Sequence, residues 1–198
     1  MKLVSKYALG VAAFLGLVIA GGTYKLDAAK AASDSDWGPK WADNGNLILP
    51  VGYHEWVFVG SPLTPNALND GKAGFPEYHN VYIQPQAYSI YKETGTFPEG
   101  TIMLKELQLT QPGENEDGSR SEVSGRGYFP AARNGIDIAV KDSKRFSESK
   151  NWGYFNFGHH APPYKATAAA APVANCAQCH IDNATKDMVF TKFYAILN

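Results

Sequence analysis

Cysteine is scarce in this sequence. Only Cys176 and Cys179 occur among its 198 residues, so one intrachain disulfide is the most that could form. An excess of one charge is also lacking, because 18 Lys and Arg nearly balance 19 Asp and Glu. The formal net charge of -1 gives no indication of nucleic acid or an anionic membrane as a partner. Aromatic residues are plentiful, which suits a β-rich core and equally a buried flat ligand.

Long apolar runs are absent except near the N-terminus. Residues 7–20 are apolar and uncharged, follow two lysines, and precede an Ala-Lys-Ala cleavage pattern at residues 29–31. This run is shorter than the roughly 20 residues that span a bilayer, and its layout is typical of a secretory signal peptide. We therefore expect residues 1–31 to be removed during export to the periplasm, with an uncleaved membrane anchor as the second interpretation. Residues 32–46 are polar and should form a flexible N-terminal segment.

The two cysteines lie in the segment CAQCH, which ends at His180. C-x-x-C-H is the signature of covalent c-type haem attachment. Its two thiols bind the two vinyl groups of the ring, and the adjoining histidine ligates the iron. A disulfide or a thioredoxin-like redox pair would use the same cysteines, but no βαβ pattern surrounds them. The sequence therefore predicts one c-type haem, held by Cys176 and Cys179, with His180 as the proximal ligand.

Methionine is nearly as scarce as cysteine, since only Met103 and Met188 remain after Met1. Electron-transfer cytochromes often fill the sixth iron position with methionine. Met188 follows His180 so closely that it would have difficulty reaching the opposite side of the ring. The other histidines, each more often a surface or hydrogen-bonded residue than a ligand, are His54, His79, His159 and His160. The sequence thus offers no obvious sixth ligand, and an open iron indicates small-molecule chemistry or gas binding.

Alternating apolar residues and turn signals predict four or five antiparallel strands with short helices in one domain, residues 47–198. The fold class expected is α+β, mainly antiparallel β-sheet, with a helical C-terminal haem-attachment segment. Residues 111–127 should form a mobile surface hairpin loop. The expected strands are residues 55–60, 79–84, 101–110, 135–142 and 152–160, and the expected helices are residues 64–71 with Thr64 as N-cap, 84–95 and 183–197.

Lys105 looks misplaced in the strand TIMLKELQLT. Alternation puts it on one face with Met103, Leu107 and Leu109, whereas Glu106 points to the other face. An ammonium among apolar side chains is costly unless it finds a partner or loses its proton. From the residues alone, we expect Lys105 to reach past Leu107 to the surface or to pair with a buried carboxylate.

Five segments together resemble the cytochrome P-460 family, over residues 47–194: WVFVGSPLTPNALNDGKAGF, VYIQP, FPEGTIMLKEL, VKDSKRF and CAQCHIDNATKDMVFTKFY. The resemblance implies a mostly antiparallel β fold, a homodimer, and one c-type haem with an open distal side. In that family a lysine nitrogen is bonded to a meso carbon of the haem. Lys105 occupies the corresponding position, after FPEGT, and is therefore expected to be cross-linked.

The resemblance also implies a function. Members with the lysine resemble hydroxylamine oxidases, and members without it resemble cytochrome c′-beta, which binds nitric oxide. We therefore expect a periplasmic enzyme that oxidises hydroxylamine, via an iron nitrosyl, to nitrous oxide and passes electrons to a periplasmic cytochrome c. The alternative is a nitric oxide carrier or sensor without oxidase activity. A plain electron carrier would need a sixth ligand.

Family enzymes resemble one another in needing a distal carboxylate, which acts as a base near the iron-bound substrate. Asp137 in GIDIAVKD occupies what we take as the matching place, on the face opposite Ile136 and Ile138. Pairing of Asp137 with Lys141 or Arg145 is the structural alternative.

Glu106 is the second candidate for the base, although strand alternation points it away from Lys105. Phe129, Ala131 and Phe155 are expected to form the apolar distal wall. His79 and Arg133 are candidates for a supporting role near the base.

Overall fold

The computed structural model describes residues 37–198. The predicted signal peptide and residues 32–36 of the predicted flexible segment lie outside the described residues. Within the remainder of that segment, the Trp41 ring packs against Phe146 and Phe155. In the described part of the chain, no helix has the length and apolar character needed to cross a membrane.

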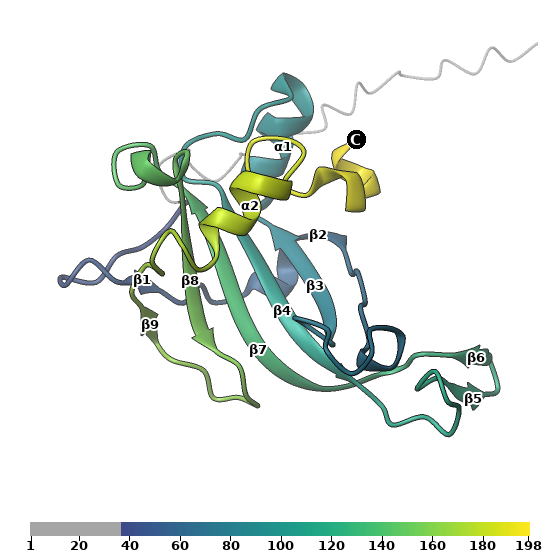
Figure 1. The fold of residues 1–198 in the computed structure, drawn as a ribbon. Coiled ribbons are helices and arrows are strands. Elements are labelled where there is room, and N and C mark those ends of the chain that lie inside the picture. The colour runs from purple at the N-terminus through teal and green to yellow at the C-terminus, as the bar shows by residue number, and fades with distance from the viewer. Residues whose placement is uncertain (1–36) are drawn as a thin grey trace, which may run out of the picture. The chain divides into compact units, whose positions relative to one another are not determined.

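The fold is built on one five-stranded sheet in which every neighbouring pair is antiparallel (Figure 1). This arrangement confirms the predicted α+β fold class. Each predicted strand is present, with boundaries shifted by a few residues. In spatial order the strands are β2 (Val57–Gly60), β3 (Tyr78–Ile83), β4 (Ile102–Thr110), β7 (Pro130–Lys141) and β8 (Trp152–Gly158).

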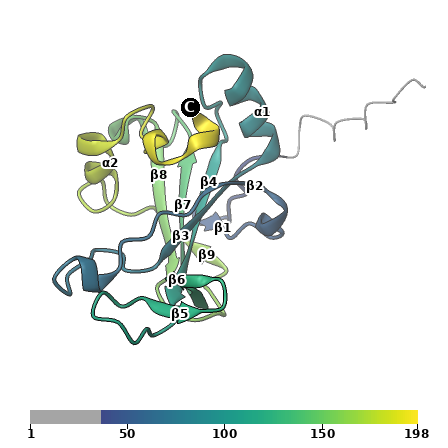
Figure 2. The same ribbon diagram turned by 90° about the vertical axis from the view of Figure 1, so that its right-hand side faces the viewer.

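Shorter elements surround this sheet. Two small strand pairs are β1 (Leu47–Ile48) with β9 (Thr167–Ala168) and β5 (Arg120–Glu122) with β6 (Gly125–Gly127). The α-helices are α1 (Pro85–Thr94) and α2 (Ala177–Asn183), and 3-10 turns are η1 (Tyr53–Glu55), η2 (Asn66–Leu68), η3 (Ser147–Ser149), η4 (Thr191–Phe193) and η5 (Ala195–Leu197). Figure 2 shows α2 and β1 on opposite sides of the sheet.

The boundaries of α1 follow from local sequence, as predicted. Pro85 occupies the first turn, where its missing N–H costs nothing. Gly95 ends the helix in the left-handed region, with φ 71°, and its N–H donates to the carbonyl of Tyr91.

Two predicted helical features are wrong. Residues 183–197 do not continue α2 as a helix, because Asp187 and Met188 have φ values of 46° and 63°, which a right-handed helix cannot contain. Short 3-10 turns follow instead. Thr64 does not cap a helix: the residue preceding η2 is Pro65, and the Thr64 hydroxyl donates to the carbonyl of Phe75 at 2.7 Å.

Each face of the sheet carries its own apolar core, as strand alternation requires. One core contains Met103 of β4 and Tyr154 of β8, and both α1 and α2 contribute to it. The other contains Ile102 and Leu104 of β4 with the three alternate apolar residues of β7, Ile136, Ile138 and Val140. Lys105 therefore lies on the Met103 face, which α2 covers.

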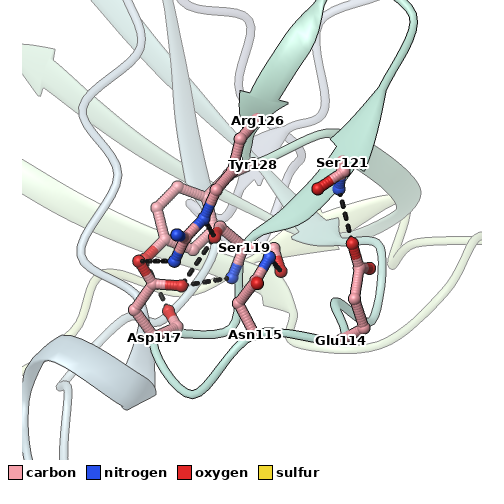
Figure 3. A network of polar contacts seen from close by, with 7 residues as sticks. All are labelled: Glu114, Asn115, Asp117, Ser119, Ser121, Arg126 and Tyr128. Carbon is pink, nitrogen blue, oxygen red and sulfur yellow. Dashed lines mark hydrogen bonds and ion pairs between the residues drawn. The ribbon is translucent and has the colours of Figure 1, made fainter.

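Residues 111–127 include the β5–β6 hairpin, held by the polar contacts drawn in Figure 3. Asp117 accepts hydrogen bonds from the Ser119 N–H and hydroxyl, and its Oδ2 lies 2.9 Å from Arg126 Nη2. These hydrogen bonds, from Ser119 first and Arg126 next, lower the pKa of Asp117 to about 2. The hairpin lies at the end of the sheet remote from α2 (Figures 1 and 2). Its mobility stays a prediction.

Candidate functional site

The site begins at α2, which carries the C-x-x-C-H motif. Cys176 directly precedes the helix and Cys179 lies one turn later, so both thiols emerge from neighbouring positions. Both cysteines are free and exposed, while Ala177 between them is buried in the same core as Met103. The motif therefore carries two accessible thiols on a helix that packs against the core of the sheet.

His180 is oriented by its own backbone surroundings. Its Nδ1 lies 2.7 Å from the carbonyl oxygen of Met188, and a carbonyl can only accept, so Nδ1 carries the proton. Nε2 is then left with the lone pair that a metal ligand needs. Burial lowers the pKa of His180, the Met188 carbonyl opposes this, and the charge of Lys105 adds to the lowering. The imidazole is neutral at pH 7 and competent to ligate iron.

The His180 ring is enclosed by two aromatic side chains. Its centroid lies 4.6 Å from that of Tyr154 and 4.7 Å from that of Phe190. The Tyr154 hydroxyl is buried and has no hydrogen-bond partner among residues 37–198. Burial, with the charges of Cys176, Asp187 and Cys179, raises the pKa of Tyr154. Because buried hydroxyls normally have partners, this orphan fits a site that a polar group of a bound cofactor completes.

Lys105 has a carboxylate partner, which is one of the two outcomes expected from the residues alone. Lys105 of β4 and Asp137 of β7 are directly opposite in the sheet register, and Nζ lies 3.0 Å from Oδ2. The two side chains are 24% and 23% exposed. The Phe75 ring covers the ammonium, with its centroid 3.7 Å from Nζ.

Asp137 is held by three side chains. Besides Lys105, the Asn156 amide donates to Oδ1 at 2.8 Å, and His159 Nε2 lies 3.1 Å from Oδ2. Burial acts to raise the pKa of Asp137, but Lys105 and the Asn156 hydrogen bond outweigh it, so the pKa lies below its ordinary value. The alternative pairing of Asp137 is absent, since Lys141 pairs with Asp187 and Arg145 with Asp142.

The Lys105–Asp137 pair interacts electrostatically with residues of the C-x-x-C-H motif. The charge of Lys105 acts on the pKa values of both His180 and Cys176, although burial is the larger influence on each. The charge of Asp137 acts on the pKa of Cys176 as well. Lys105 and Asp137 lie on the sheet face of Met103 and Ala139, and α2 packs against that same core through Ala177. The structure thus places the five predicted site residues, Lys105, Asp137, Cys176, Cys179 and His180, on one side of the sheet.

Glu106 belongs to a different cluster, on the opposite face of the sheet. Its carboxylate accepts from the Tyr53 hydroxyl at 2.5 Å and lies 3.3 Å from His54 Nε2. Arg133 Nη1 is 3.6 Å from the same carboxylate. The structure therefore separates Glu106 and Arg133 from Lys105, as alternation indicates for Glu106.

The prediction that Phe155 forms part of the apolar distal wall is wrong. Phe155 packs with Trp41 and Phe146 in the core on the far side of the sheet, because it alternates with Tyr154 and Asn156 along β8. Phe129 and Ala131 lie where β7 begins, and their carbonyls accept from Gln111 and Gln108. Their role as wall residues stays a prediction.

Sequence reasoning missed Phe75 and the contacts that surround it. The Phe75 ring meets His79 and His159 edge to face, with both centroid distances 5.7 Å. His79 Nε2 lies 3.2 Å from the carbonyl of Phe75, and burial, with the charge of Lys105, lowers the pKa of His79. Phe75 stands in an irregular loop, where no periodicity could indicate its position.

Comparison with known families agrees with this geometry. The family model Cytochrome P460 matches residues 50–191. The chain therefore belongs to the cytochrome P460 family, a family of haem proteins. A comparison with curated protein sequences finds no match.

Proposed function

We propose that Cys176, Cys179 and His180 bind one c-type haem. Each thiol adds across a vinyl double bond, with sulfur bonding to one carbon and hydrogen to the other, so no oxidant is needed. Both thiols are free and exposed, and His180 is neutral with Nε2 available. The unpartnered Tyr154 hydroxyl beside the motif supports a bound group in this space.

We propose further that Lys105 becomes bonded to a meso carbon of that haem. The new C–N bond replaces one N–H and one C–H bond, so two protons and two electrons leave, and a two-electron oxidant must accept the electrons. Lys105 is directed into the space that α2 covers, and its charge acts on His180 and Cys176. A bonded nitrogen no longer carries the ammonium charge that now faces Asp137.

The function that this site supports best is oxidation of hydroxylamine. Two hydroxylamine molecules give one nitrous oxide, one water, four protons and four electrons. When bound, the haem supplies an iron that binds the substrate nitrogen and accepts electrons. The observation that carries the proposal is the Lys105–Asp137 pair, 3.0 Å apart beside the C-x-x-C-H motif. The pair supports the proposal because its carboxylate is the candidate base and its lysine occupies the position of the family's cross-link.

Asp137 has the surroundings of a proton acceptor. Paired with the Lys105 ammonium, it is a weak base, because its pKa is held low. Cross-linking removes that ammonium and leaves Asn156 and His159 as partners, so the pKa of Asp137 rises towards the value that a base needs. Oδ2 also lies 3.1 Å from His159, which is 44% exposed and can pass a proton to solvent.

The remaining proposals concern the setting of the reaction. Export to the periplasm is proposed from the signal-peptide pattern of residues 1–31. A periplasmic cytochrome c is the proposed electron acceptor, and the homodimer is the proposed assembly; the family resemblance supports both. Nitric oxide binding without oxidation is the competing function, in which Lys105 would only pair with Asp137.

One experiment tests both the chemistry and the activity. The holoprotein is digested with trypsin, and the haem peptides are weighed by mass spectrometry. We expect a species in which one haem joins the Cys176–Cys179 peptide to the Lys105 peptide. The same preparation, given hydroxylamine and an oxidised one-electron acceptor, should release nitrous oxide. A haem joined to the cysteine peptide alone, together with nitric oxide binding and no nitrous oxide, would establish the competing function.

A further inference from the structure

The turn that follows α2 carries the carbonyl that orients His180. Lys186 and Val189 donate to each other across this turn, at 3.3 Å and 2.8 Å. Positive φ values at both central residues, 46° at Asp187 and 63° at Met188, are the pattern of a type I′ turn. Glycine and asparagine favour this conformation, whereas methionine rarely adopts it. The turn therefore needs contacts from outside to hold it.

Those contacts come from the Asp187 side chain. Its Oδ2 accepts from Lys141 Nζ at 2.6 Å, and its Oδ1 accepts from Trp152 Nε1 at 3.2 Å. Lys141 ends β7, Trp152 begins β8, and the two residues are 8% and 0% exposed. Lys141 also donates to the carbonyl of Phe97 at 2.8 Å. A partly buried, charge-assisted connection thus joins the turn to two strands of the main sheet.

Both packing and polar contacts act on the turn, because Met188 and Val189 are buried in the apolar core at 6% and 5% exposure. A cavity of about 180 Å³ lies beside it, lined by residues that include Lys150, His180, Lys186 and Met188. On this side the turn is open. The Asp187 contacts with the sheet therefore add to core packing in holding the Met188 carbonyl 2.7 Å from His180 Nδ1.

We infer that Asp187, through Lys141 and Trp152, is a positioning residue that sets the strength of the His180 hydrogen bond and so the reduction potential of the haem. An imidazole that donates from Nδ1 to a fixed carbonyl is a more basic ligand. A more basic ligand stabilises ferric over ferrous iron and lowers the potential. The inference rests on the proposed haem attachment at His180, and it does not depend on which reaction the haem performs.

The test compares two variants with the wild-type holoprotein. Asp187→Asn keeps a residue that type I′ turns favour and removes the ion pair with Lys141. It also removes a negative charge near the iron, which by itself would raise the potential. The double variant Lys141→Met with Asp187→Asn removes both charges, so the net charge stays the same. Asp117→Asn, in the β5–β6 hairpin at the other end of the sheet, is the control for loss of one carboxylate (Figures 1 and 3).

We expect both Asp187 variants to keep the haemochrome spectrum of a haem with two thioethers. Their midpoint potentials should rise by at least the equivalent of a tenfold change in the redox equilibrium, about 59 mV for one electron. The iron–histidine stretch of the ferrous protein should move to lower frequency in resonance Raman spectra. The potential of Asp117→Asn should equal that of the wild type.

Four outcomes would overturn the inference. If the double variant had the wild-type potential, Asp187 would affect the haem only through its negative charge and not by positioning the turn. An unmoved potential in both variants would leave Asp187 with no influence on the haem. If Asp187→Asn does not fold, Trp152→Phe, which removes one hydrogen bond to Asp187, must raise the potential by a smaller amount, and no rise would contradict the inference. A wild-type protein without the haemochrome spectrum would overturn haem attachment and this inference together.

Discussion

Lys105 Nζ and Asp137 Oδ2 face each other across β4 and β7 at 3.0 Å, and each is the nearest charged partner that the sheet register provides for the other. The pair links the two proposed functions of this face, because the lysine is the proposed cross-link and the aspartate the proposed base. Their mutual pairing also means that a change in one residue alters the charge seen by the other. Substitutions must therefore distinguish the loss of the Lys105–Asp137 ion pair from the loss of the proposed bond between Lys105 and the haem.

Lys105→Arg makes that separation. Arginine keeps a positive charge opposite Asp137, but its guanidinium stays protonated and cannot form the proposed bond. We expect the variant to fold, to keep the thioethers of Cys176 and Cys179, and to bind nitric oxide. It should show an ordinary c-type absorption spectrum and release no nitrous oxide from hydroxylamine.

Lys105→Leu is the companion variant, which removes the charge as well. Asp137 keeps Asn156 and His159, so the loss of its ion pair should cost about 1–2 kcal/mol in unfolding free energy. Its spectrum and lack of oxidase activity should match those of Lys105→Arg. Oxidase activity and an unusual spectrum in both variants would show that Lys105 is only a structural residue.

Asp137→Asn tests the proposed base. Asparagine has the same shape and can still bond Asn156 and His159, but it cannot accept a proton at pH 7. Turnover of hydroxylamine should fall by roughly 10²–10⁴-fold, the usual effect of losing a general base, while haem content stays unchanged. Asp137→Ala should lose turnover to a similar extent.

Glu106→Gln is the matched control, on the same strand but the opposite face. Glu106 is buried and accepts from Tyr53, so its neutral variant should lose about 1–3 kcal/mol of unfolding free energy. Its turnover should remain close to that of the wild type. If instead Glu106→Gln abolished turnover and Asp137→Asn did not, the assignment of the base would be reversed.

The low pKa of Asp137 should make the unfolding free energy depend on acid pH in protein that has not been cross-linked. A carboxylate whose folded pKa lies below its unfolded value, about 3.9, contributes stability that is complete above that value. The contribution disappears as the pH falls through the folded pKa. Urea unfolding at a series of pH values should show a constant difference between wild type and Asp137→Asn down to about pH 4–5, and a shrinking difference below it. A difference that already shrinks near neutral pH would mean that the pKa of Asp137 is raised.

Much of this site could be predicted because its signals are local. The spacing of CAQCH, the proline and glycine that bound α1, and the alternation that puts Lys105 on the Met103 face each depend on a few neighbouring residues. The partner of Lys105 could not be predicted from residues alone. It depends on how β4 and β7 align across an irregularity between Leu107 and Gln108, and that alignment involves the whole sheet.

The segment after α2 shows why a local pattern can mislead. Residues 183–197 have apolar residues at helical spacing, and yet the chain turns at Asp187 and Met188. Partly buried contacts from Lys141 and Trp152, which are distant in sequence, stabilise that turn. Tertiary contacts thus override helix propensity where the turn orients His180.

The last prediction concerns the resting haem: its iron should be five-coordinate and high-spin. Three histidines outside the motif already use Nε2 in other contacts: His54 with Glu106 on the opposite face, His79 with the Phe75 carbonyl, and His159 with Asp137. The backbone carbonyl of Met188 accepts a hydrogen bond from His180, the proposed proximal ligand. Met103 is the remaining thioether on the Lys105 face, and it is buried in the core at 7% exposure. Electron paramagnetic resonance at neutral pH should therefore show a high-spin ferric signal in the wild type and, unchanged, in Met103→Leu. A dominant low-spin signal would contradict five-coordination, and its conversion to high-spin in Met103→Leu would identify Met103 as the sixth ligand.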